Sequence, residues 1–179
     1  MYLGIDTSTP RTSLALGTAE GIVASLSVLG RSREDVVVPA LERLLAWAGR
    51  DVGDIAGIAA GIGPGLFTGL RVGVETAKTL AQVLDRPLVA VSSLDVLAHG
   101  VRHAGSPIVA VIDARRGEVF HATYRATAEG VVREGEMGVC PPEALVDGLR
   151  ALGAALVVGD GALRYRDRLA AAGPDIAFG

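Results

Sequence analysis

The fold is decided by the stretch GPGLFTGLRVG, which occupies residues 63–73. It follows an apolar run at residues 55–62 and precedes a segment whose apolar residues have helical spacing. Glycine adopts backbone angles that other residues reach only at a cost. Gly63, Pro64 and Gly65 therefore predict a sharp turn between a strand and a helix.

Beyond this turn, small residues recur every four positions and form one stripe along the predicted helix: Gly65, Gly69, Gly73 and Ala77. Each glycine inside a helix costs about 0.5–1 kcal/mol relative to alanine, so a stripe of them indicates a compensating close approach of another backbone. That backbone belongs either to this chain or to a partner, and the spacing alone favours neither.

Composition places the chain among globular proteins. Of 179 residues, 50% are hydrophobic and 21% are charged, which excludes a disordered chain. A net charge of −3 argues against a domain that grips nucleic acid by itself. The apolar runs are short, and the N-terminus has no signal-peptide pattern, so we expect a cytoplasmic protein without a membrane span. A single cysteine, Cys140, excludes an internal disulfide.

The order of predicted elements indicates a duplicated α/β fold with mixed sheets. We expect strands at residues 2–6, 12–17, 22–29, 55–62, 88–91, 107–113, 119–125, 131–137 and 155–158. We expect helices at residues 35–49, 67–84, 93–103, 141–152 and 160–172. Each half begins with strands and ends with alternating strands and helices. We therefore predict two lobes, residues 1–103 and residues 104–179.

Polar residues gather where two of the strands end. Asp6, Thr7 and Ser8 follow the first strand, a place where ligands often bind, but an Asx-type turn without a ligand explains the pattern equally well. Asp113 opens a second polar cluster in a hairpin-like turn. Residues 32–35 have the form of a capping box, and Pro39 implies that the helix is kinked or begins nearer residue 35.

Four blocks of sequence resemble one protein family. They are IDTS at residues 5–8, GPGLFTGLRVG at residues 63–73, IDARRGEVF at residues 112–120 and the weaker VVGDGA at residues 157–162. In this order and spacing they resemble the TsaB (formerly YeaZ) family. Its members are the small ASKHA-fold subunits of the bacterial machinery that makes threonylcarbamoyladenosine beside the anticodon of tRNA. The resemblance implies an actin-like fold and a non-catalytic role.

The resemblance also implies partners. The catalytic paralogue TsaD would form a heterodimer with this chain, a TsaE-type ATPase would join the larger complex, and tRNA would be contacted only through that complex. The surface that pairs with TsaD would also allow a homodimer of the chain alone, and the sequence leaves homodimer and monomer open. The helices at residues 35–48 and 67–84 would supply the paired surface. The expected interface residues are Val37, Leu41, Leu44, Gly65, Gly69, Arg71, Gly73 and Ala77.

Several features depart from a catalytic or nucleotide-binding pattern. Arg33 stands where TsaD-type subunits carry a metal-binding histidine, and the spaced pair His99 and His103 lacks an acidic third ligand, so no metal site is expected. Asp6 is not followed by glycine, and arginines follow Asp113. We expect no cofactor and no ATP hydrolysis, and we place any ATP or ADP at the TsaD partner. A weak nucleotide site is left open at Asp6, Thr7, Ser8 and Asp113.

Two enzymatic alternatives remain. An independent ASKHA-type ATPase or small-molecule kinase would need a glycine-rich phosphate cradle beside Asp6 or Asp113. A glycoprotease-like peptidase is a distant third, because the sequence has no His-Glu-x-x-His, no nucleophile elbow and no histidine motif near Cys140. Compared with the family pattern, we also expect the second lobe to be incomplete at its C-terminal end.

Overall fold

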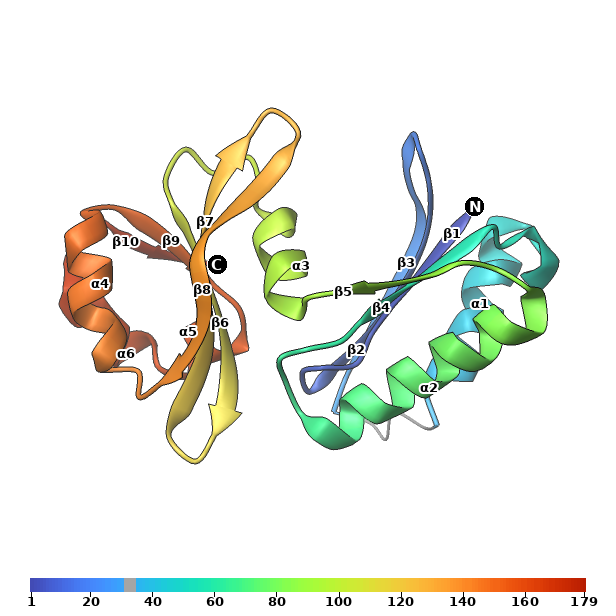
Figure 1. Ribbon diagram of the computed structural model, residues 1–179, viewed down its shortest axis with the longest axis horizontal. Helices are drawn as coiled ribbons and strands as arrows, with labels where there is room; N and C mark the ends of the chain where they lie inside the picture. The colour runs from blue at the N-terminus through green and yellow to red at the C-terminus, as the bar shows by residue number, and fades with distance from the viewer. Residues whose placement is uncertain (31–34) are drawn as a thin grey trace. The chain divides into compact units, whose positions relative to one another are not determined.

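The computed structural model describes residues 1–30 and 35–179, which form two compact units, Met1–Ser93 and Leu94–Gly179 (Figure 1). Each unit contains one five-stranded sheet. The boundary between the units falls between Ser93 and Leu94 in the chain, whereas the sequence predicts a boundary after residue 103. Helix α3 (Ser93–Gly100) accounts for the difference, because all but its first residue belongs to the second unit.

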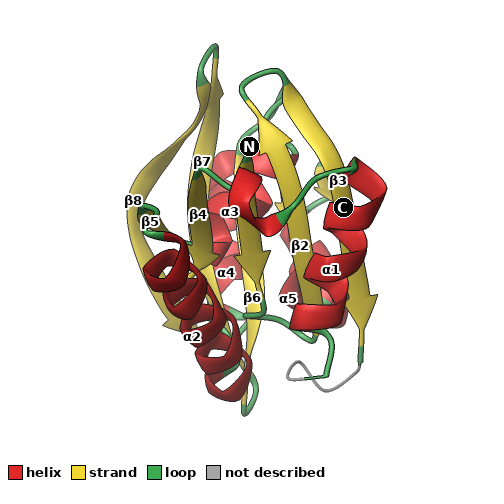
Figure 2. Ribbon diagram, turned by 90° about the vertical axis from the view of Figure 1, so that its right-hand side faces the viewer, coloured by secondary structure: helices red, strands yellow, loops and turns green. Residues whose placement is uncertain are grey.

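The first unit is built on a mixed sheet with the strand order β3-β2-β1-β4-β5. Its strands are β1 (Tyr2–Asp6), β2 (Arg11–Thr18), β3 (Gly21–Leu29), β4 (Gly57–Gly61) and β5 (Leu88–Val91). The first three strands pair antiparallel, whereas β4 and β5 run parallel to β1. Helices α1 (Val37–Ala48) and α2 (Phe67–Leu84) cover the same face of this sheet (Figure 2). A short 3-10 helix, η1 (Val52–Asp54), precedes β4.

The second unit repeats this plan with the strand order β10-β9-β6-β7-β8. Its strands are β6 (Ile108–Arg115), β7 (Glu118–Thr127), β8 (Gly130–Cys140), β9 (Ala155–Val158) and β10 (Ile176–Phe178). Alternate residues of β6 face two separate cores. Val109 and Val111 pack with α4 (Ala144–Leu152), and Ile108 and Ala110 pack with α3. The predicted duplicated α/β fold with mixed sheets is thus confirmed.

The structure differs from the sequence predictions at a few element ends. The helix predicted at residues 160–172 is divided into α5 (Asp160–Arg164), α6 (Arg166–Leu169) and a 3-10 turn, η2 (Ala170–Ala172). The break falls at Tyr165, whose backbone (φ −109°, ψ 22°) leaves the helical region. Strand β10 has only three residues, too few for an alternating pattern to reveal it.

Helix α1 begins at Val37, so Pro39 lies in the first turn, where a missing backbone N–H leaves no helical hydrogen bond unmade. This confirms a start near residue 35 rather than a kinked helix. The predicted capping box at residues 32–35 and Arg33 involve residues outside those described. Among the described residues, no helix is long and apolar enough to cross a bilayer.

The glycine stripe of α2 packs against the chain's own first turn. Thr7 is fully buried, and its Oγ1 donates a 2.7 Å hydrogen bond to the carbonyl of Gly69. A Cβ at Gly73 would overlap Thr7 Oγ1, and a Cβ at Gly65 would overlap the carbonyl of Ser8. The backbone that the stripe admits is therefore that of residues 7–8, not that of a partner.

This packing corrects the residues expected at a partner interface. Val37, Leu41, Leu44 and Ala77 lie in the core of the first unit, each at most 5% exposed. Gly69 and Gly73 are also buried, and Gly65 is partly buried. The sequence reveals that these residues require close contact but does not reveal with what. Only Arg71 is exposed, with its guanidinium 5.9 Å from the centroid of the Phe67 ring.

Replacing Gly73 with alanine should destabilise the first unit by roughly 1–3 kcal/mol, because the new methyl overpacks a buried site against Thr7. Urea unfolding would measure the loss. Thr7→Ala in the same chain should recover part of it by making room. Gly148→Ala is the matched control, since Gly148 lies inside α4 with nothing within 4 Å of its missing Cβ. A Gly73→Ala protein as stable as the parent would contradict this packing.

Helix α3 is tied to the second unit by a buried tyrosine. Tyr124 is 1% exposed, and its hydroxyl donates a 2.6 Å hydrogen bond to Asp95 Oδ1. Burial, and then the bond to Asp95, raise the pKa of Tyr124 well above its ordinary value. Arg133 lies 3.8 Å from the same carboxylate oxygen. The polar group of the tyrosine therefore has a charged partner although the ring is inside the core.

Tyr124→Phe should lower the free energy of unfolding by about 1–2 kcal/mol, because a short hydrogen bond to a carboxylate is lost while the ring still fills its place. Tyr165→Phe is the control, since the Tyr165 hydroxyl lies 3.5 Å from Asp113 Oδ1, the limit of a hydrogen bond. Chemical denaturation of both variants tests the expectation, and equal losses would contradict it.

Candidate functional site

The first strand-end cluster is organised around the carboxylate of Asp6, the last residue of β1. Its Oδ1 accepts hydrogen bonds from the backbone N–H of Ser8 at 2.8 Å and from Ser8 Oγ at 2.7 Å. Its Oδ2 accepts a third bond from Ser93 Oγ at 2.8 Å. The bond from the Ser8 amide makes an Asx-type turn, so the ligand-free interpretation accounts for this geometry.

The glycine turn at residues 63–65 packs against the same cluster. The N–H of Leu66 donates to the carbonyl of Ser8 at 2.6 Å, which holds the two turns together. Gly61, at the end of β4, lies against Asp6 so closely that a Cβ there would overlap Oδ2. The Gly63–Pro64 peptide bond is cis. Thr7 and Ser8 are both fully buried, so their hydroxyls face the protein rather than solvent.

The second cluster, in the other unit, is organised around Asp113, which is 4% exposed. Its Oδ1 accepts a 3.0 Å bond from the backbone N–H of Arg115. Its Oδ2 lies 3.3 Å from the guanidinium of Arg115 and 3.6 Å from that of Arg164. Two arginines thus compensate one buried carboxylate.

A second acidic residue lies beside Asp113. Asp160 Oδ1 accepts a 3.2 Å bond from the backbone N–H of Asp113. Burial, together with the negative charge of Asp113, raises the pKa of Asp160 above its ordinary value, although hydrogen bonds from the Asp113 and Gly161 amides act in the opposite direction. Gly161 is required at the start of α5 because a Cβ there would approach the Asp113 amide to 2.9 Å.

The hairpin that follows Asp113 has an unusual backbone. Arg115 and Arg116 have positive φ values of 66° and 54°, in the left-handed region that side chains with a Cβ rarely occupy. Arg116 and Gly117 form the two-residue loop between β6 and β7, where positive φ matches the twist of the strands. The Arg115 side chain faces Asp113 and its backbone N–H donates to Asp113 Oδ1, so this amide is already engaged within the turn rather than open to a phosphate.

These contacts define what the clusters can do. The predicted weak nucleotide site divides between the units, with Asp6, Thr7 and Ser8 in the first and Asp113 in the second. Both carboxylates already accept hydrogen bonds or ion pairs from the chain's own donors. A metal-bound phosphate or a proton would have to compete with these donors for the carboxylate oxygens. Nucleotide binding at these residues stays a prediction.

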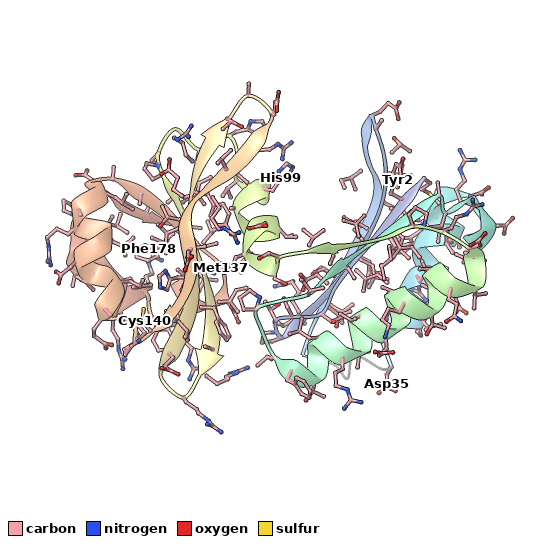
Figure 3. All side chains as sticks on the ribbon, in the orientation of Figure 1. Tyr2, Asp35, His99, Met137, Cys140 and Phe178 are labelled. Atoms are coloured by element: carbon pink, nitrogen blue, oxygen red, sulfur yellow. The ribbon has the colours of Figure 1, made fainter. Side chains whose placement is uncertain are left out.

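The remaining reactive side chains do not assemble a site. His103 lies beyond the end of α3, so it does not share a helix face with His99. Within the described residues there is no group of three metal-ligating side chains. His99 and Cys140 lie well apart in the second unit (Figure 3). Burial, followed by the charge of Glu118, raises the pKa of the Cys140 thiol, which disfavours the reactive thiolate.

Four residues of the two clusters could not be identified from the sequence. Ser93 reaches Asp6 from the start of α3, and Asp160, Arg164 and Tyr165 reach Asp113 from α5 and the residue after it. The only available signal was the pair of glycines around Asp160, which resembles a second turn that brings a helix close to a strand.

Asp160→Asn should raise the free energy of unfolding at pH 7, because the folded protein disfavours the ionised carboxylate that asparagine replaces. A raised pKa gives Asp160 a contribution that is most favourable below its ordinary pKa of 3.8 and is lost as the pH rises through the folded value. The advantage of asparagine should therefore shrink as the pH falls toward 4. Urea unfolding at both pH values checks this, with the exposed Asp167→Asn as control.

Comparisons with known proteins place the chain in a family. A family model described as tRNA N6-adenosine threonylcarbamoyltransferase, TsaD, matches residues 21–151. The tRNA threonylcarbamoyladenosine biosynthesis protein TsaB of Escherichia coli is 33% identical over 131 residues, 72% of this chain and 57% of that protein. The Bacillus subtilis protein of the same name is 39% identical over 124 residues, 69% and 54% of the two chains. The chain thus spans a little over half the length of these relatives.

Solved structures agree with these matches. YeaZ from Pseudomonas aeruginosa superimposes with a TM-score of 0.85 at 31% identity, covering 99% of this chain and 82% of that one. Component A of the (R)-2-hydroxyglutaryl-CoA dehydratase of Acidaminococcus fermentans has a TM-score of 0.57 at 12% identity, covering 99% and 91%. This second likeness shows the ASKHA-like fold alone. From its sequence matches and its fold together, the chain belongs to the TsaB (YeaZ) family.

Proposed function

We propose that the chain is a non-catalytic partner subunit required for threonylcarbamoyl transfer to the adenosine next to the tRNA anticodon. The main support for this proposal is that the two carboxylates at the strand ends are engaged by donors of the chain itself. Asp6 accepts three hydrogen bonds from Ser8 and Ser93, and Asp113 is engaged by Arg115 and Arg164. Groups that could organise a metal and a phosphate in an enzyme of this fold instead stabilise turns.

The catalytic partner in this proposal is a TsaD-type paralogue, and its docking site is the outer surface of α1 and α2. This surface is defined by the exposed apolar side chains of the two helices: Val38, Trp47, Phe67 and Val83. Trp47 is 65% exposed, Phe67 74% and Val83 76%. Large aromatic side chains in solvent are the groups that most often dominate binding energy at protein interfaces. Both helices cover the same face of one sheet, so these four side chains are carried by one packed core, on the flanks of the helices that stay exposed (Figure 2).

The same surface would serve a second copy of the chain when the paralogue is absent, which gives a homodimer in isolation. A TsaE-type ATPase would complete the assembly in the cytoplasm, and tRNA would be contacted only through the complex. The chain's net charge of −3 supports this last point, because a phosphate backbone is bound through basic residues. We assign no cofactor to this chain and place ATP or ADP at the TsaD partner.

Co-purification with the TsaD-type paralogue of the same organism tests this function directly, followed by reconstitution of the modification with and without the chain. Trp47→Arg and Phe67→Arg should each reduce binding about tenfold or more, because each replaces an exposed aromatic anchor with a charge. Leu163→Arg is the matched control, since Leu163 is also exposed, at 60%, but lies in the second unit.

Two results would contradict the proposal. Full modification without this chain would show that it is not required. Tight ATP binding with turnover by the isolated chain would support the independent ASKHA-type ATPase instead. Gly69→Arg and Gly73→Arg do not test docking, because both glycines are buried and the change would disrupt the packing on Thr7.

A further inference from the structure

Ser93, where the first unit ends, is hydrogen-bonded to the carboxylate of Asp6 at the end of β1. Ser93 is the last residue of the first unit and the first residue of α3, and it is 3% exposed. Its N–H donates to the carbonyl of Gly63 at 2.8 Å, and its Oγ donates to Asp6 Oδ2 at 2.8 Å. Ser93 is therefore fixed by both the glycine turn and the end of β1.

The next residue already belongs to the other unit. Leu94 is fully buried, and it packs in a cluster with Ala98 of α3 and with Ile108 and Ala110 of β6. Asp95, one position further, accepts the hydrogen bond of Tyr124. Helix α3 thus packs within the second unit from its second residue onward. The peptide bond between Ser93 and Leu94 joins two well-packed bodies without a linker.

The two carboxylate oxygens of Asp6 accept hydrogen bonds from different residues. Oδ1 closes the turn of Asp6 with Ser8, whereas Oδ2 is left for Ser93. Gly61 makes room for Oδ2, because any Cβ at that position would overlap it. A hydrogen bond to a carboxylate is stronger than one between neutral groups, and a negative charge beside the first turn of a helix is favourable. These features make the Asp6–Ser93 contact suited to hold the start of α3.

We propose that Asp6 is a positioning residue that anchors Ser93 to the first unit, and so limits how freely the second unit moves about the Ser93–Leu94 junction. This gives Asp6 a role that needs no nucleotide. It also predicts that a ligand able to take Oδ2 away from Ser93 would loosen the junction.

The test compares two isosteric replacements. Ser93→Thr keeps the hydroxyl, whereas Ser93→Val has the same shape without it. Each is made in a Cys140→Ser background with spin labels at Ile22→Cys in the first unit and Leu163→Cys in the second, positions that are 71% and 60% exposed. Double electron–electron resonance then gives the distribution of distances between the labels, with excess unlabelled protein present to suppress intermolecular signals.

We expect a wider distance distribution for Ser93→Val than for Ser93→Thr, which should match the parent. The amide of residue 93 should exchange its hydrogen about tenfold faster in the valine variant, because local opening no longer breaks a bond to a carboxylate. Ser8→Ala is the matched control, since it removes a hydroxyl from the same carboxylate but leaves the Ser93 bond. Its distribution should stay as narrow as that of the parent.

Equal distributions for Ser93→Val and Ser93→Thr would overturn the proposal. So would a Ser8→Ala distribution as wide as that of Ser93→Val, because Asp6 would then act through its turn and not through Ser93. Thermal unfolding of every variant separates these results from loss of fold. If both replacements of Ser93 prove unstable, Ser93→Ala tested against the parent gives the same comparison with a smaller side chain.

Discussion

The structure of the first unit depends on one close contact, in which the turn after β1 lies directly against α2. Thr7 Oγ1 donates to the carbonyl of Gly69, and the missing Cβ of Gly73 leaves the space that the Thr7 side chain fills. Only glycine permits a backbone–side-chain approach of this kind inside a helix. The contact fixes β1 relative to α2, and this places Asp6 where it can reach Ser93. The positions of the sheet, of the glycine turn and of Ser93 at the end of the first unit therefore all depend on the contact between Thr7 and α2.

The second unit solves the same problem with different chemistry. Its central strand also ends against a small residue at the start of a helix, since Asp113 lies against Gly161. There the buried group is a carboxylate rather than a hydroxyl, so it needs compensation by Arg115 and Arg164. The ionised form of the neighbouring Asp160 is destabilised, because burial and the negative charge of Asp113 raise the pKa of Asp160. The duplication is thus one of topology, and the polar interior of each unit has its own electrostatics.

Much of the fold could be predicted from the sequence because its signals are local. The strands of the first meander, the glycine end of α1 and both bounds of α2 follow from alternation, helical spacing and turn residues. Strand β10 and the break at Tyr165 could not be predicted, since three residues carry no period and the break needs no special residue. The candidate site was predicted less well. Spacing shows that Gly73 needs a close neighbour, but the identity of that neighbour depends on which strand the helix covers. Ser93 is 87 residues from Asp6, and no local pattern connects them.

Because the glycine stripe of α2 packs inside the first unit, only the other sides of α1 and α2 are free to contact a partner. A helix that packs on a sheet presents opposite sides to the core and to solvent, and the small or aliphatic residues expected at the interface fill the core side. The exposed flanks of the two helices carry Trp47, Phe67 and Val83, which are costly to leave in water and are not among the residues of the first unit's core. The family resemblance implies these two helices as the paired surface, and both carry large apolar side chains that the first unit leaves exposed. The proposed docking role of these helices therefore rests on the exposed aromatic side chains. The glycines of α2 have a different role, because they allow the helix to pack closely on residues 7–8 of its own unit.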